Sequence, residues 1–166
     1  MNLPVEIFTT DNLKIEGNIH NYKRTITSVK VEDFNDQNTL DYLDVFKSLV
    51  NNQKLNLQDD FKLLTVTLKQ QVMEKARSKP YEPLKLNIGS TLVVGENDVA
   101  LQNDVLSQQI NYYTSKFFAG TNDVQGNVLI AIPKEIANNQ NLQLKVVQEF
   151  KNKDNVKKEI VFIDLY

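Results

Sequence analysis

The sequence predicts a mainly all-β protein, a β-sandwich or barrel decorated by one α-helix. Short segments in which apolar and polar residues alternate recur along the chain, with turn-forming residues between them. One segment instead has the three- to four-residue spacing of apolar residues that is typical of an amphipathic helix. A length of 166 residues without a linker-like stretch favours a single β-sandwich domain over residues 1–166.

The first third of the chain predicts two short strands. Leu13, Ile15 and Ile19 alternate with polar residues, and a second alternation covers residues 26–31. The polar tract HNYKRT between them is expected to form a hairpin connection. The polar segment DFNDQN then ends the alternation.

A helix is expected at about residues 39–50. Asn38 is a suitable N-cap, and Asp41 would place a carboxylate in the first turn, near the unpaired N–H groups. The apolar residues that would pack on a core are Leu40, Leu43, Phe46, Leu49 and Val50.

The remainder of the chain predicts further strands. Residues 61–72 alternate, with Leu64, Val66 and Leu68 on one face, and their β-branched residues favour a central strand. Other strands are expected at residues 84–88, 91–94 (ended by Gly95), 127–132, 142–150 and 159–165, the last two as a hairpin. The sequence leaves residues 96–113 open between a helix and irregular structure.

The stretch FFAGTNDVQGNVLIAIPKE raises the question of a phosphate-binding loop. Such a loop needs lysine and then serine or threonine directly after its last glycine, at the start of a helix. Here Asn127 follows Gly126, and the aliphatic run VLIAI ends at Pro133 as a strand would. We therefore expect a turn that precedes a strand, with Gly126 at a position of positive φ.

Few groups in the chain suit catalysis or metal binding. There is no cysteine, and a zinc site or a catalytic triad would rest on His20, the one histidine. An EF-hand loop starting at Asp33 would need glycine at its sixth position, where Asn38 stands. The adjacent Asp59 and Asp60 would point to opposite faces of a strand. We therefore expect no enzyme activity, no cofactor and no bound metal, and a carboxylate-based hydrolase is the weaker alternative.

Aromatic residues gather in the segment YYTSKFF. Its candidate interaction surface comprises Tyr112, Tyr113, Phe117 and Phe118, because aromatic side chains are favoured in protein interfaces. The alternative is that alternate members of the segment pack in the core.

The C-terminal two-thirds of the chain resemble a known family. The succession FKLLTVTLKQ, PLKLNIGSTLVV, FFAGTNDVQGNVLIAIPKE and NLQLKV, over about residues 60–150, is similar to the telokin-like, immunoglobulin-fold domains of bacterial secreted proteins and lipoproteins. The matching positions are Gly120, Gly126, the strand Val128 to Ile132, and Pro133-Lys134. The residues LIAI stand where the family has phenylalanine, and the helix at 39–50 has no obvious counterpart. The resemblance implies an immunoglobulin-like β-sandwich with one inserted or decorating α-helix.

That family is of mostly unknown function and has no shared catalytic residues. The resemblance implies a non-enzymatic cell-envelope or secreted interaction module of a Gram-positive bacterium, binding a protein or surface polymer. The start MNLPVEIFTTDN has no signal peptide, so a lipid anchor would need a leader that has been removed. The alternative is an intracellular (cytoplasmic), phage- or plasmid-encoded interaction protein.

Composition narrows the class of partner further. The net charge is −2 and the lysines are spread along the chain, so we expect no nucleic-acid partner. No apolar run approaches the length of a membrane span. The ligand and the oligomeric state are left open by the sequence.

Overall fold

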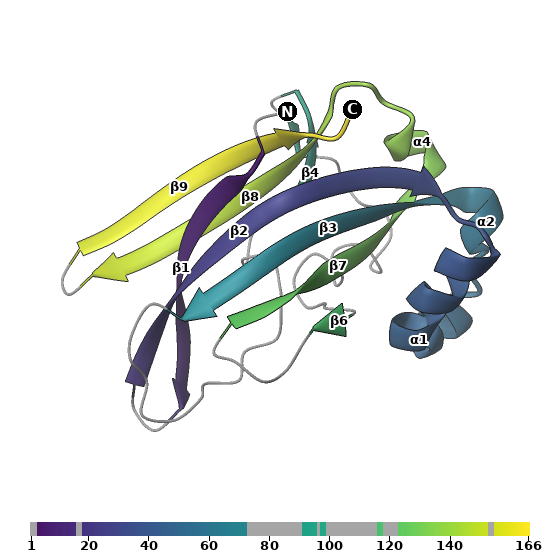
Figure 1. Ribbon diagram of the computed structural model, residues 1–166. Coiled ribbons are helices and arrows are strands. Elements are labelled where there is room, and N and C mark those ends of the chain that lie inside the picture. The colour runs from purple at the N-terminus through teal and green to yellow at the C-terminus, as the bar shows by residue number, and fades with distance from the viewer. Residues whose placement is uncertain are drawn as a thin grey trace.

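The computed structural model describes residues 3–15, 18–72, 91–95, 97–98, 116–117, 123–152 and 155–166. In these residues the chain is mostly β-structure, in two antiparallel sheets with few helices (Figure 1). This confirms the prediction of a mainly β protein.

The first sheet has five strands in the order β1-β2-β3-β7-β6, and the second has four in the order β5-β4-β8-β9. The strands of the first sheet are β1 (Val5–Ile15), β2 (Asn18–Asp33), β3 (Phe61–Val72), β6 (Lys116–Phe117) and β7 (Asp123–Pro133). Those of the second are β4 (Thr91–Val94), β5 (Asn97–Asp98), β8 (Leu142–Asn152) and β9 (Asn155–Asp164). The predicted strands at 61–72 and 91–94 and the C-terminal hairpin are therefore present, whereas the strand expected at 84–88 lies outside the described residues.

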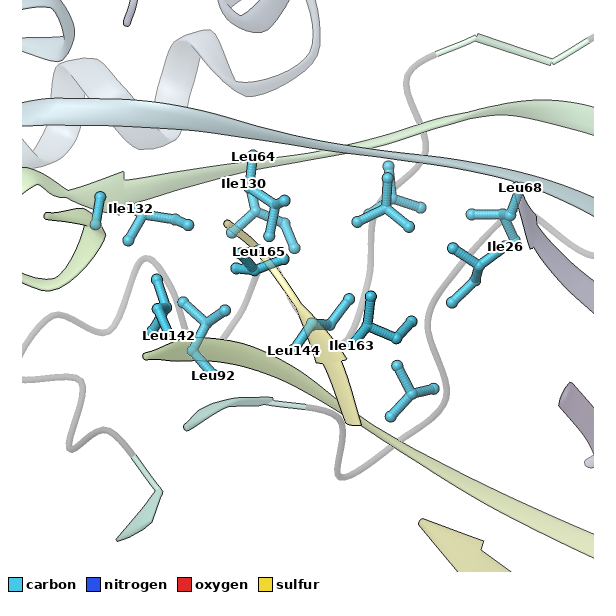
Figure 2. Packing of buried hydrophobic residues seen from close by; sticks show 14 of the residues in the cluster. Ile26, Leu64, Leu68, Leu92, Ile130, Ile132, Leu142, Leu144, Ile163 and Leu165 are labelled. Carbon is cyan, nitrogen blue, oxygen red and sulfur yellow. The ribbon is translucent and has the colours of Figure 1, made fainter. Parts of the chain in front are cut away.

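The two sheets face each other across one apolar core. Leu64 of β3 and Ile130 of β7 meet Leu144 of β8 and Ile163 of β9 in this layer (Figure 2). All four are almost fully buried. Burying a Leu or Ile side chain stabilises the fold by about 1.5–3 kcal/mol, so this contact holds the sheets together.

The central strand β3 has a second buried face. Its even-numbered residues enter the core between the sheets, as the alternation predicts, while Leu63 and Phe61 point to the opposite side. There they pack beneath helix α1 (Asp36–Gln53), against Tyr42 and Phe46. Helix α1 thus forms a third layer that covers part of the outer face of the first sheet (Figure 1).

Helix α1 begins earlier than its apolar spacing indicates. The N-cap is Asn35 and not Asn38 as predicted: the Asn35 Oδ1 accepts from the Asn38 N–H at 2.9 Å, and the Asn38 Oδ1 accepts from the Asn35 N–H at 2.6 Å. This reciprocal pair is a capping box, in which asparagine takes both positions. At the other end Lys54 adopts the left-handed conformation, and its N–H bonds back to the carbonyl of Asn51. The described residues also contain two short helices, α2 (Leu57–Asp60) and α4 (Lys134–Ala137).

The tract HNYKRT is part of strand β2, so the predicted hairpin connection is wrong. Tyr22 and Arg24 within it are each 2% exposed, because they point into the space between the sheets. A buried arginine in a polar tract has no distinctive sequence pattern, which explains the error. The register of β2 on β3 shifts between Ile26 and Ser28, so Thr27 is the extra residue of a β-bulge.

The prediction for Gly126 is also wrong. Gly126 lies inside β7, opposite Leu68 of β3, and among the described residues the glycine with positive φ is Gly95 (φ 63°). Strand β7 begins at Asp123, so its first residues are polar and resemble a loop in sequence. The turn that requires glycine follows β4 instead.

We expect Asn35→Ala to lower the free energy of unfolding by about 1 kcal/mol, the usual value for loss of an N-cap acceptor. Chemical denaturation measures the change. The control is Asn35→Ser, which keeps an acceptor oxygen and should stay close to the parent protein. Equal losses in both variants would contradict the assigned cap.

We expect Gly95→Ala to cost about 1 kcal/mol, because an L residue is strained at positive φ. A Cβ at this position meets nothing within 4 Å, so the cost comes from the backbone alone. Gly95→Asn should cost less, since asparagine tolerates this conformation better than alanine does. Thermal unfolding of the two variants provides the comparison, and an Asn variant no more stable than the Ala variant would argue against backbone strain.

Candidate functional site

Of the four residues of the predicted aromatic surface, the structure describes one, Phe117. Phe117 lies in β6, where it pairs with Gly126 of β7. Tyr112, Tyr113 and Phe118 lie outside the described residues. This surface therefore stays a prediction.

A polar groove lies between helix α1 and the outer face of the first sheet. Its volume is about 320 Å³, at the lower end of the range for small-ligand sites. Strands β2, β3 and β7 line it from the sheet, and helix α1 lines it from the side. We call this feature the α1 groove.

The α1 groove begins where the outer face of the sheet changes from apolar to polar. Leu63 of β3 pairs with Ala131 of β7 in the apolar layer beneath the helix. Four residues further along β3, and on the same face, Thr67 stands opposite Asn127, and its hydroxyl donates to the Asn127 Oδ1 at 2.8 Å. The strands leave the cover of α1 between these pairs, so hydroxyl and amide groups replace aliphatic ones.

The bulge in β2 determines which residues that strand contributes to the groove. Before Thr27 the even-numbered residues of β2, such as Ile26, face the core between the sheets. After it, Val29 and Val31 pack against that core, and the even-numbered residues face outward. The bulge thereby places Ser28, Lys30 and Glu32 along the α1 groove.

The groove carries an excess of negative charge. Asp41 and Asp44 lie about one helical turn apart on α1, and both line the groove. Glu32 of β2 lines it as well. One lysine lines the groove with these three carboxylates, and its Nζ lies 2.6 Å from the Glu32 Oε2. Asp41 also accepts a bond from the Gln37 side chain at 3.4 Å. The groove can therefore offer carboxylates, hydroxyls and amides to a ligand with hydrogen-bond donors or positive charge.

A second depression, of about 450 Å³, lies between α1 and α2. Leu57 and Val50 form its base and belong to the buried layer under the helix. Asp59 borders it and accepts from the Asn56 side chain. Asp59 and Asp60 lie in helix α2, so the geometry of a strand does not decide how they are placed relative to each other. The depression therefore lies at the boundary of the helical layer, and polar residues of α1 and α2 line it beside the apolar base.

A buried polar cluster lies at the other side of the first sheet, between the two sheets. Arg24 and Gln70 are each 2% exposed, and the Arg24 Nε donates to the Gln70 Oε1 at 2.7 Å. The guanidinium also lies over the ring of Tyr22, 5.2 Å from its centroid. Nearby in the same layer, Gln148 of β8 accepts from the Phe8 N–H of β1 at 2.8 Å and so links the sheets.

Gln148 also donates to Glu159 of β9, at 2.7 Å. These contacts satisfy groups that would be costly to bury alone. They link residues of different strands. In the sequence, the only sign of these contacts is the presence of polar residues at positions that face inward.

The Tyr166 phenol, outside the α1 groove, has a raised pKa. Burial raises the pKa of the Tyr166 phenol above its usual value, and the charge of Asp33 raises it further. Its hydroxyl donates to the carbonyl of Ala137 in α4. The phenol therefore stays protonated, and able to donate, to higher pH than a free tyrosine.

The described residues contain no group of three or more His, Cys, Asp or Glu side chains that could hold a metal ion. His20 lies in β2, opposite Asp11 of β1. Within the same residues, no helix is both long enough and apolar enough to cross a membrane.

Comparison of the chain with models of known protein families, with characterised proteins and with solved structures found no match.

We expect Gln70→Leu to destabilise the protein by about 2 kcal/mol, because it removes a hydrogen bond from a buried charged group. Urea denaturation measures the loss. The matched control is Gln70→Glu, which keeps the acceptor oxygen and adds a charge opposite to that of Arg24. If the Leu variant is as stable as the parent, the bond to Arg24 contributes nothing net.

Proposed function

We propose that this chain is a non-enzymatic binding module that holds a basic segment of a partner protein in the α1 groove. The observation that carries this proposal is the composition of the groove. Threonine hydroxyls and an asparagine amide on the sheet stand opposite Asp41 and Asp44 on the helix. Carboxylates pair with lysine and arginine, and hydroxyls and amides hydrogen-bond to peptide groups in a fixed direction.

The sign of the charge favours a protein over a phosphate-bearing surface polymer. Glu32, Asp41 and Asp44 would repel phosphate groups, and Lys30 is already paired with Glu32. The same carboxylates would attract a lysine or arginine side chain that enters the groove. The volume of about 320 Å³ suits one or two side chains, so we expect the rest of the partner to lie along the surface.

We further propose that the two sheets form an immunoglobulin-like sandwich, and the strand order supports this. Such sandwiches have strands in the order A-B-E-D in one sheet and C-F-G in the other, to which a C′ strand can be added beside C. Here β2-β3-β7-β6 corresponds to A-B-E-D, and β5-β4-β8-β9 corresponds to C′-C-F-G. Strand β1 is then an added edge strand, and α1 and α2 lie in the connection between strands A and B.

The cell envelope of a Gram-positive bacterium is the proposed location. The resemblance of residues 60–150 to domains of bacterial secreted proteins supports it. A cytoplasmic interaction protein is the alternative, and the location of the protein in fractionated cells decides between them.

The α1 groove can be tested by titration with peptides while backbone amide signals are followed by NMR. A short peptide of alternating lysine and serine is expected to shift the signals of Thr65, Thr67 and Asn127. The double variant Asp41→Asn, Asp44→Asn should weaken binding about tenfold, because it removes two exposed charge contacts. Added salt should weaken binding to the parent protein as well.

The control variant is Asp60→Asn, Glu135→Gln, which removes the same charge outside the groove and should bind as the parent does. A glutamate-serine peptide should not bind. Saturable binding of purified teichoic acid at the same amides, or equal losses in both double variants, would overturn the proposal of a basic partner segment.

A carboxylate-based hydrolase remains the second candidate, because three carboxylates line one groove. Two features favour binding instead: Asp44 is exposed to solvent, and Glu32 is engaged by Lys30. A general acid normally needs a site shielded from water. Release of reducing sugars from purified peptidoglycan by the parent protein, and its loss in Glu32→Gln, would favour the hydrolase.

A further inference from the structure

Strand β9 forms an open edge of the second sheet. In the part of the chain that the structure describes, it pairs with β8 alone (Figure 1). The Leu165 N–H donates to the Leu142 carbonyl at 3.1 Å, and the register runs without a shift to Val146↔Val161 and beyond. In an antiparallel ladder, alternate residues direct both backbone groups to the same neighbour. The odd-numbered residues of β9 therefore bond to β8, and the even-numbered ones direct their N–H and C=O groups to the open edge.

The side chains on the outer face of this strand are unusually apolar for a surface. The described residues include five large exposed hydrophobic side chains, and three of them lie on β9. They are Val156 (61% exposed), Ile160 (49%) and Phe162 (52%). All have even numbers, so they share the outer face of the sheet with Lys158 and Asp164.

The order of these side chains is self-complementary. From Lys158 to Asp164 the outer face reads positive, apolar, apolar, negative. Reversed, the same row reads negative, apolar, apolar, positive. Two copies of the row laid antiparallel therefore place opposite charges together and apolar groups together.

From this pattern we propose that a second copy of the chain pairs with β9, antiparallel, about a two-fold axis at Val161. In this register Ile160 stands opposite Phe162 of the other copy, and Lys158 stands opposite Asp164. The backbone groups also match, since even-numbered residues meet even-numbered residues and can exchange N–H···O=C bonds. The result is one continuous sheet across a closed dimer.

Neighbouring registers lose this complementarity. With the axis at Ile160, Phe162 would face Lys158, and with the axis at Phe162, Ile160 would face Asp164. Lysines on an edge strand can also serve to prevent pairing. Here Lys157 and Lys158 guard only the first half of β9, and the half from Ile160 onward carries no positive charge.

Charge exchange tests the proposal in the intact chain. Sedimentation velocity from low micromolar to near-millimolar concentration is expected to show a species of twice the 19.1 kDa chain mass. Lys158→Asp and Asp164→Lys should each raise the dimer dissociation constant about tenfold, because each places like charges opposite one another twice. The double variant Lys158→Asp, Asp164→Lys should restore dimerisation. Lys157→Asp is the control and should leave it unchanged, since Lys157 faces no charge across the axis.

A single cysteine tests the register, because the parent chain has none. Val161→Cys should form a disulfide-linked dimer quickly under mild oxidation. Opposed residues of a non-hydrogen-bonded pair lie about 4.5 Å apart between Cα atoms, within the range for a disulfide. Glu159→Cys is more exposed but lies four residues from its copy along the strand, so it should link slowly.

Several results would overturn the proposal. One is a monomer throughout the concentration range, and another is failure of the charge-exchanged double variant to recover when its thermal unfolding is normal. Faster linkage through Ile160→Cys than through Val161→Cys would overturn the register. If β9 is instead an edge for a strand of another protein, the parent stays monomeric and all the cysteine variants link equally slowly.

Discussion

The structure depends on the burial of both faces of β3. Its even-numbered residues hold the two sheets together, and its first odd-numbered residues hold helix α1 against the sheet. A strand buried on both faces cannot shift by one residue without exposing one set of side chains. The pairing of β2 and β7 with β3 is therefore fixed, and the sheet offers a rigid surface on which α1 docks. The α1 groove exists because the helix covers only the part of this surface that is apolar.

Much of this arrangement could be predicted from the sequence. The period-two alternation of residues 61–72 correctly indicated a central strand with two distinct faces, and the spacing from Leu40 to Val50 correctly indicated a helix. The expectation that Leu40 packs on the core is wrong, because its side chain is exposed. These signals are strong because burial imposes them on every second, or every third to fourth, residue. The capping box was missed because asparagine occupied both of its positions.

The candidate groove could not be predicted, because it depends on a local irregularity. The bulge at Thr27 exchanges the inward-facing and outward-facing residues of β2. Nothing in the sequence around Thr27 distinguishes a bulge from a regular strand. Arg24 was likewise expected in a surface connection, since arginine is seldom buried. Its bond to Gln70 joins residues that are 46 positions apart in the chain. Such partners become visible only in three dimensions.

The position of α1 in the chain has a consequence for the order of folding. Strands β2 and β3 are sequence neighbours, yet residues 34–60 separate them and contain both α1 and α2. Their ladder therefore closes a long loop and cannot form as a local hairpin, unlike the ladder of β8 and β9. The ladders of β1 with β2 and of β8 with β9 can close locally, whereas the ladder of β2 with β3 needs the long loop to close. A helix packed by one face opens at less cost than a strand buried on both faces, so hydrogen exchange should be faster in α1 than in β3.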